Sequence, residues 1–138
     1  MKNETVPIAA MDDETRRLFE AALAVQANAH VPYSRYPVGC ALVSSVGTLH
    51  VGANIENAAY GVTLCAECSL VSAMVMGGGG RIVAFACVNG AGERLMPCGR
   101  CRQLLYEHGG GAMLIDRAGG PSPLRDLLPE AFGPEALP

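Results

Sequence analysis

The sequence predicts an α/β fold, a three-layer α/β/α sandwich built on one mixed sheet. Helical and strand patterns alternate along the chain in the order α, β, β, α, β, α, β, α, which is typical of helices packed on both faces of a sheet. The chain has 138 residues, 50% of them hydrophobic and 17% charged, which suffices for one hydrophobic core. We therefore expect residues 1–138 to form a single domain.

The first element is expected to be an amphipathic helix that Asp12 or Asp13 can cap. It extends over about 17 residues and ends before Pro32, because proline stops a helix. Its apolar stripe consists of Leu18, Ala22, Val25 and Ala29. Two prolines in residues 31–37 then predict a loop.

A hairpin, an irregular loop and a buried helix follow. Apolar runs at residues 38–43 and 48–53, joined by Ser-Ser-Val-Gly, predict two paired strands. Residues 54–63 lack a regular pattern but are rich in Asn, Glu and Tyr, which is typical of functional loops. Residues 65–76 are apolar on nearly every face and end in a run of glycines, as expected of a buried helix.

The last part of the chain supplies two strands and two helices. Residues 82–88 predict a short buried strand, and residues 97–108 predict a helix that stops at three glycines. Residues 112–115 predict a weak strand, and residues 124–128 a short helix between prolines. The largest apolar group of the remaining tail is Phe132.

Charge and hydropathy argue against two classes of partner. The formal net charge is −3 and no cluster of Lys and Arg is present, so nucleic acid is not an expected partner. No apolar run is long enough to span a bilayer, and residues 1–10 do not have the pattern of a signal peptide. We therefore expect no membrane association and a cytoplasmic location.

Two pairs of cysteines have the spacing of metal ligands: Cys65 with Cys68, and Cys98 with Cys101. One interpretation is a closed structural zinc site in which all four cysteines bind the metal. The other is an open site in which Cys65, Cys98 and Cys101 bind zinc, a water takes the fourth position, and Glu67 transfers protons. Cys65 and Cys98 each precede a predicted helix, where the helix dipole favours the thiolates that zinc requires.

Five motifs decide between these interpretations. The segments VPYSRYPVGCAL, NIENAAY, CAE and PCGRCRQ resemble, in order and spacing, those of the small homotetrameric zinc-dependent cytidine deaminases. LLPEAF resembles the C-terminal segment of the same family, so the resemblance covers about residues 30–132. The pattern C-A-E followed by P-C-x-x-C also matches the signature of zinc nucleobase deaminases. A closed structural site explains neither Glu67 nor the NIEN loop.

The resemblance implies a cytidine deaminase-like fold and the hydrolysis of cytidine and 2′-deoxycytidine to uridine and 2′-deoxyuridine, a reaction of pyrimidine salvage. It implies one Zn²⁺ per subunit, bound by Cys65, Cys98 and Cys101. It further implies that zinc-activated hydroxide attacks C4 of the pyrimidine, while Glu67 carries a proton to N3 and another to the departing amine. A single carboxyl group can serve as both acceptor and donor in this way.

The resemblance also implies the residues that bind the nucleoside. Asn54 and Glu56 match binders of the ribose hydroxyls, although an Asn here can instead form a turn. Tyr36 matches a position where the family often has Phe, an aromatic wall for the pyrimidine, although it can instead pack in the core. Ala66 would offer its backbone N–H to the base. Because Glu56 repels phosphate, a free nucleoside is expected rather than a nucleotide.

Tyr60 and Phe132 match aromatic positions that reach neighbouring active sites in the family. The resemblance therefore implies a homotetramer with active sites at subunit interfaces, completed by the tail of about residues 121–138. Ordinary packing of the tail is the alternative for Phe132.

The remaining cysteines are expected to play secondary parts. Many members of the family carry Arg directly after C-A-E, where this chain has Cys68. A neutral thiol beside the ligands is at best a weak donor, so the bound water should be less acidic and the helix N-termini should offset more of the thiolate charge. Cys40 and Cys87 lie in apolar strand runs and are expected to be buried without a chemical role.

A related zinc enzyme is the second candidate. Blasticidin S deaminase applies the same chemistry to a cytosine-bearing antibiotic, but the NIEN loop and the LLPEAF tail favour a nucleoside.

Overall fold

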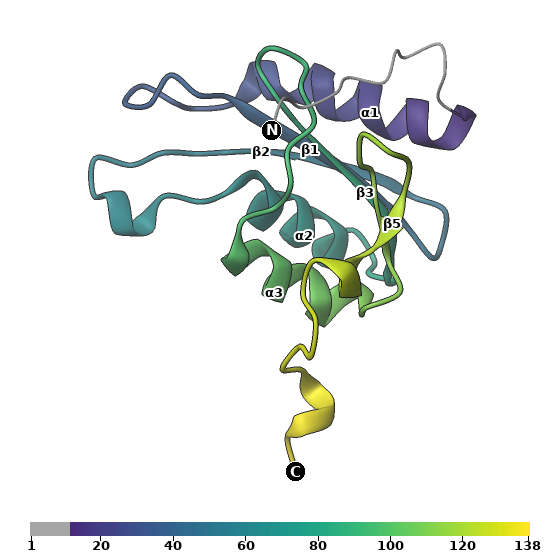
Figure 1. The fold of residues 1–138 in the computed structure, drawn as a ribbon. Helices are drawn as coiled ribbons and strands as arrows, with labels where there is room; N and C mark the ends of the chain where they lie inside the picture. Colours follow the sequence, from purple (N-terminus) through teal and green to yellow (C-terminus); the bar gives the residue numbers. More distant parts are fainter. Residues whose placement is uncertain (1–11) are drawn as a thin grey trace.

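The computed structural model describes residues 12–138, in which a five-stranded mixed sheet lies between two helical layers (Figure 1). In chain order the helices and strands are α1 (Asp13–Val25), β1 (Val38–Ser44), β2 (Leu49–Ala53), α2 (Ala66–Met76), β3 (Ile82–Asn89), α3 (Gly99–Gly109), β4 (Leu114–Ile115) and β5 (Ser122–Pro123). Short 3₁₀ turns are η2 (Gln26–Asn28), η3 (Tyr60–Val62), η4 (Leu124–Asp126) and η5 (Pro134–Ala136). The segment 1–10, considered above for a signal peptide, lies outside the described residues.

The sheet is ordered β2-β1-β3-β4-β5. Strand β1 pairs antiparallel with both β2 and β3, so that Cys40 lies opposite Gly52 on one side and Cys87 on the other. Strand β3 pairs in parallel with β4, and β4 pairs antiparallel with β5. The predicted hairpin and mixed sheet are therefore confirmed.

The two faces of the sheet are covered by different helices, as the three-layer prediction requires. In β1, Ala41 belongs to the cluster that packs against α1, whereas Cys40 and Leu42 belong to the cluster that packs against α2 and α3. This division follows from the alternation of side chains along a strand. Phe85 in β3 is fully buried on the α2 and α3 side.

Helix α2 approaches the edge of the sheet closely because β2 has a glycine beneath it. A Cβ atom on Gly52 would lie 2.6 Å from both the Ala66 carbonyl oxygen and the Leu70 nitrogen. The absence of a side chain at this position allows the first turn of α2 to rest on β2. This contact fixes the turn that carries Glu67.

The structure differs from the predicted elements at three places. The first helix, capped by Asp12, is α-helical only to Val25 and continues as the turn η2. Residues 124–126 form a 3₁₀ turn rather than the expected short α-helix. Strand β5 was not predicted, because two residues that include Pro123 carry no alternating pattern, although an edge strand accepts proline. Within the described part of the chain, no helix has the length and apolar character of a membrane span.

Candidate metal centre and substrate pocket

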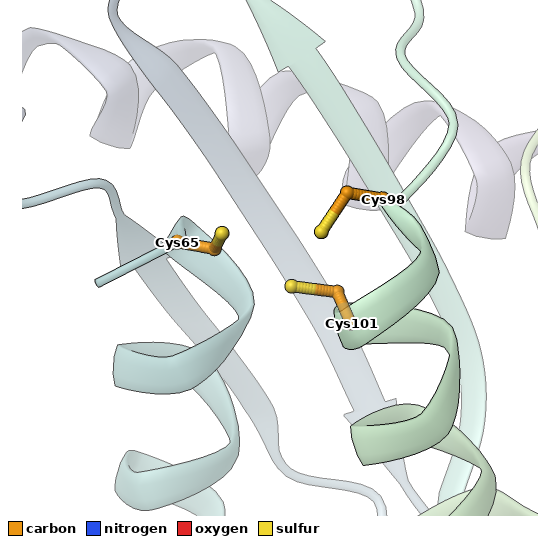
Figure 2. A group of neighbouring side chains, drawn as sticks. All are labelled: Cys65, Cys98 and Cys101. Carbon is orange, nitrogen blue, oxygen red and sulfur yellow. The ribbon is translucent and has the colours of Figure 1, made fainter. Parts of the chain in front are cut away.

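Three cysteine sulfurs converge where the N-termini of α2 and α3 meet (Figure 2). Cys65 is the N-cap residue of α2, Cys98 is the N-cap residue of α3, and Cys101 lies in the first turn of α3. Their Sγ atoms all lie within 4.8 Å of one another. Tetrahedral zinc with Zn–S bonds of about 2.3 Å separates its sulfur ligands by about 3.8 Å, so small movements suffice for coordination.

The surroundings of these thiols oppose ionisation at Cys65 and Cys101 and favour it at Cys98. Burial raises the pKa of Cys65, and burial followed by the Glu67 carboxylate raises that of Cys101. Burial also acts against ionisation of Cys98, but hydrogen bonds from the Cys101 backbone and from the Cys101 and Cys65 side chains bring its pKa below the usual value. Because a soft divalent metal displaces thiol protons when it binds, this donor set fits Zn²⁺.

Cys68 lies outside the group of three sulfurs, although it is one turn from Cys65. Its Sγ atom instead accepts a long contact from the guanidinium of Arg100, with Nη2 at 3.9 Å. Among the described residues the metal-binding group therefore has three cysteines. This arrangement favours the open site over the closed four-cysteine site.

A cavity of about 190 Å³ adjoins the sulfurs. Its lining residues are Val38, Asn54, Cys65, Ala66, Glu67, Cys87, Leu95, Met96 and Cys98. Cys65 and Cys98 belong both to the metal-binding group and to the cavity wall. A metal ion bound by these cysteines would therefore lie next to a molecule in the cavity.

Glu67 is the acidic group of this cavity. Its side chain lies in the first turn of α2 and the residue is 4% exposed. Burial raises the pKa of the Glu67 carboxyl above its ordinary value. A carboxyl group with a raised pKa exchanges protons more readily near neutral pH, as a general acid and base must.

Four lining residues were not predicted as part of the site. Val38, Leu95 and Met96 give the cavity apolar walls, and Cys87 contributes from β3. Cys87 is buried, as expected, but it also faces the cavity. Leu95 and Met96 stand directly before the P-C-x-x-C motif, and this position in the sequence could have indicated that they lie near the metal ligands.

Asn54 joins the cavity to the start of β1. Its Oδ1 accepts a hydrogen bond from the Val38 N–H at 2.9 Å, and its Nδ2 donates to the Tyr36 carbonyl oxygen at 3.0 Å. The second hydrogen of the amide group can still donate to a ligand. The residue therefore has a structural role and lines the cavity.

Glu56 lies outside the cavity lining and holds the preceding loop. Its Oε1 accepts hydrogen bonds from the Tyr33 and Ser34 N–H groups, each at 3.1 Å. The side chain of Ser34, followed by these backbone groups, holds the pKa of Glu56 below its usual value. The carboxylate is thus an anion whose second oxygen can accept from a ligand hydroxyl.

The three aromatic residues predicted to contact substrate do not line the cavity formed within one chain. Tyr36 is half-exposed, and its hydroxyl accepts from Asn89 Nδ2 at 3.3 Å. Tyr60 is 74% exposed and its ring centroid lies 5.9 Å from that of Tyr33. Phe132 is 61% exposed. The structure therefore leaves large aromatic surfaces uncovered outside the cavity.

Arg102 braces the loop that leads to the metal centre and was not predicted. Its Nε donates to the Pro97 carbonyl oxygen at 2.8 Å, and its Nη1 donates to the Leu127 carbonyl oxygen at 2.9 Å. This arginine ties the residue before Cys98 to the C-terminal part of the chain. No local sequence pattern reveals such a long-range pair.

Comparison with known proteins agrees with the geometry. The family model described as the cytidine and deoxycytidylate deaminase zinc-binding region matches residues 12–115. A protein named cytidine deaminase from Mycobacterium tuberculosis is 56% identical over 112 residues, covering 81% of this chain and 84% of the relative. Another from Sporosarcina psychrophila is 35% identical over 129 residues, covering 90% and 95%.

Solved structures show the same likeness. The crystal structure of cytidine deaminase from Mycobacterium tuberculosis matches with a TM-score of 0.86 and 52% identity, covering 88% of this chain and 99% of that one. The structure of cytidine deaminase from Burkholderia pseudomallei matches with a TM-score of 0.77 and 36% identity, covering 88% and 100%. With its three metal-binding cysteines and its buried Glu67, this chain belongs to the cytidine and deoxycytidylate deaminase family.

Proposed function

We propose that this protein hydrolyses the 4-amino group of cytidine and 2′-deoxycytidine, so that nucleoside and water give uridine or 2′-deoxyuridine and ammonia, a step of pyrimidine salvage. One observation carries the proposal: three cysteine sulfurs within 4.8 Å of one another adjoin a cavity that also contains the buried carboxyl of Glu67. The identity of 56% with a cytidine deaminase supports the same reaction.

Cys65, Cys98 and Cys101 would hold the Zn²⁺ ion. When bound, this ion supplies Lewis acidity, which lowers the pKa of a water molecule to about 7. Glu67 takes a proton from the water and delivers it to N3 of the pyrimidine. The oxygen of that water bonds to C4, and the same carboxyl group then takes its remaining proton and delivers it to the amino group, which leaves as ammonia when the C4–N bond breaks. Its burial keeps competing solvent away from these transfers.

The substrate is bound by groups around the cavity. Val38, Leu95 and Met96 offer apolar surface to the pyrimidine, and the backbone of Ala66 offers a polar contact to its edge. Asn54 and Glu56 keep hydrogen-bonding capacity for the ribose hydroxyls. The anionic Glu56 disfavours a phosphate, which selects nucleosides over nucleotides.

We further propose that residues 1–138 act as one domain within a homotetramer. The cavity of about 190 Å³ is smaller than the roughly 300–1,000 Å³ of typical ligand pockets. Tyr60 and Phe132, with Tyr36 and the tail of residues 121–138, offer aromatic surface that a neighbouring subunit would use to complete its site. The reduced thiols of the metal centre suit a cytoplasmic location.

The substrate specificity of the zinc-loaded protein is tested by following the ultraviolet absorbance of cytidine, 2′-deoxycytidine and blasticidin S. We expect rapid loss of both nucleosides and a much slower reaction of the antibiotic. Faster turnover of blasticidin S would identify the second candidate. Absence of turnover with one bound zinc per chain would favour the closed four-cysteine site.

Sharing of residues between subunits is tested by complementation. One parent carries Glu67→Gln with an intact tail and is inactive; the other carries Phe132→Ala with an intact Glu67 and has weakened activity at cytidine concentrations below its KM. Unfolding and refolding of the mixture lets the two chains assemble together. Activity above the sum of the two separately refolded parents is expected, whereas strict additivity would contradict a contribution of Phe132 to a neighbouring site.

A further inference from the structure

The C-terminal segment, residues 127–136, is attached to the outer face of α3 by side chains that have no role in the reaction described above. Gln103 Nε2 donates a hydrogen bond to the Phe132 carbonyl oxygen at 2.8 Å. The Tyr106 hydroxyl donates to Glu135 Oε1, also at 2.8 Å. One bond holds the backbone of Phe132 itself, and the other holds the side chain of Glu135, three residues further along the chain.

Gly133 lets the segment lie directly on the Tyr106 ring. A Cβ atom on Gly133 would collide with that ring and would lie 2.6 Å from Glu135 Oε2. The Tyr106 side chain is itself half-buried and packs against the main core cluster. Its hydroxyl is therefore presented from a fixed ring, so the segment docks on a rigid surface.

The same helix begins at the metal centre. Cys98 and Cys101 occupy the N-terminal end of α3, and Gln103 and Tyr106 follow within the next turns. The position of the C-terminal segment is thus set relative to the metal ligands of its own chain. Phe132 is nevertheless 61% exposed and does not line the cavity of that chain.

We propose that Gln103 and Tyr106 are positioning residues, which hold Phe132 so that its ring contacts the nucleoside bound in a second copy of the chain. This inference rests on the proposed deaminase function. Fixing the segment before substrate arrives lowers the entropy lost on binding, so its effect falls on substrate affinity rather than on the chemical step.

A double-mutant cycle tests the coupling between Tyr106 and Phe132. Steady-state kinetics with cytidine are measured for the native enzyme, Tyr106→Phe, Phe132→Ala and the double variant, together with zinc content. Tyr106→Phe removes only the hydroxyl, and we expect it to raise KM about three- to tenfold while kcat and bound zinc stay unchanged. The double variant should have the KM of Phe132→Ala alone, because both changes remove the same contact.

Variants at Glu135 provide a second measurement. Glu135→Ala should raise KM as Tyr106→Phe does, whereas Glu135→Gln keeps an acceptor for the Tyr106 hydroxyl and should stay within about twofold of the native KM. Native KM in Tyr106→Phe, or multiplied effects in the double variant, would overturn the positioning role. Failure of the native zinc-loaded enzyme to deaminate cytidine would reject the proposed function instead, so the two failures are distinguishable.

Discussion

Arg100 on α3 and Cys68 on α2 meet beside the metal centre, where Arg100 Nη2 lies 3.9 Å from Cys68 Sγ. Three thiolates around Zn²⁺ leave a net charge of −1, and a guanidinium close by offsets it. The sequence predicts that the helix N-termini offset this negative charge, because Cys68 is a poor hydrogen-bond donor. The structure adds Arg100, a cation from the other metal-binding helix.

Loss of Arg100 should weaken zinc binding. Arg100→Ala is expected to raise the Kd for zinc about tenfold, as found for groups that support metal ligands, and Arg100→Lys should recover part of this loss. Competition with a chromophoric chelator measures the constants. The matched control is Arg17→Ala, an exposed arginine of α1. Equal zinc affinity of Arg100→Ala and Arg17→Ala would contradict the role of Arg100.

Asn54→Ala should impair both stability and activity. It removes hydrogen bonds to the Val38 N–H and the Tyr36 carbonyl oxygen, so we expect the free energy of unfolding to fall by about 1–2 kcal/mol. Asn54→Asp keeps the acceptor for Val38 and should lose less stability. Both variants lose the amide donor, so both should lower kcat/KM for cytidine at least about tenfold. Urea unfolding and steady-state kinetics separate the two effects. Native kcat/KM in Asn54→Asp would remove the amide from substrate binding.

Glu56 should titrate below its usual pKa of 4.5. Hydrogen bonds to the anion lower the folded pKa, so their stabilising effect is complete above pH 4.5 and is lost as the pH falls through the lower folded value. The amide resonances of Tyr33 and Ser34, which donate to Oε1, should report this titration by NMR. Glu56→Gln should show no such transition. A midpoint above 4.5 in the native protein would contradict this assignment.

Truncation of the chain before Glu130 should lower activity and spare the metal centre. It removes Phe132, whose burial against a ligand contributes about 1.5–3 kcal/mol, so kcat/KM should fall at least about tenfold. Zinc content should stay at one ion per chain, because the three cysteines lie far upstream. Full activity of the truncated protein would refute a role of the tail in the active site.

Local patterns predicted much of the fold and four cysteines as candidate metal ligands, whereas the family resemblance implied which three of them bind the metal. The apolar stripe through Leu18 and Ala22 and the strand runs of β1 and β3 follow from side-chain periodicity, which is a local property. The spacing of Cys98 and Cys101, with Cys65 before the other helix, indicated a shared metal. The close approach of α2 to β2 depends on the absence of a side chain at Gly52, which no local pattern reveals.

The parts that sequence did not predict are pairs of residues far apart in the chain. Examples are the contact of Arg100 with Cys68 and the hydrogen bond of Tyr106 with Glu135. In the sequence, Val38 and Met96 cannot be distinguished from other apolar residues. Only their positions in the folded structure show that they line the cavity. The short strand β5 is defined by its pairing with β4 rather than by its own residues.

The most direct test of the account compares native protein with Glu67→Gln, each carrying one zinc per chain, by the initial rate of cytidine loss in the ultraviolet. Gln preserves the size of the side chain but cannot exchange a proton, so the rate should fall by at least about 10² while zinc stays bound. A rate near that of the native enzyme, with zinc bound, would contradict proton transfer by Glu67.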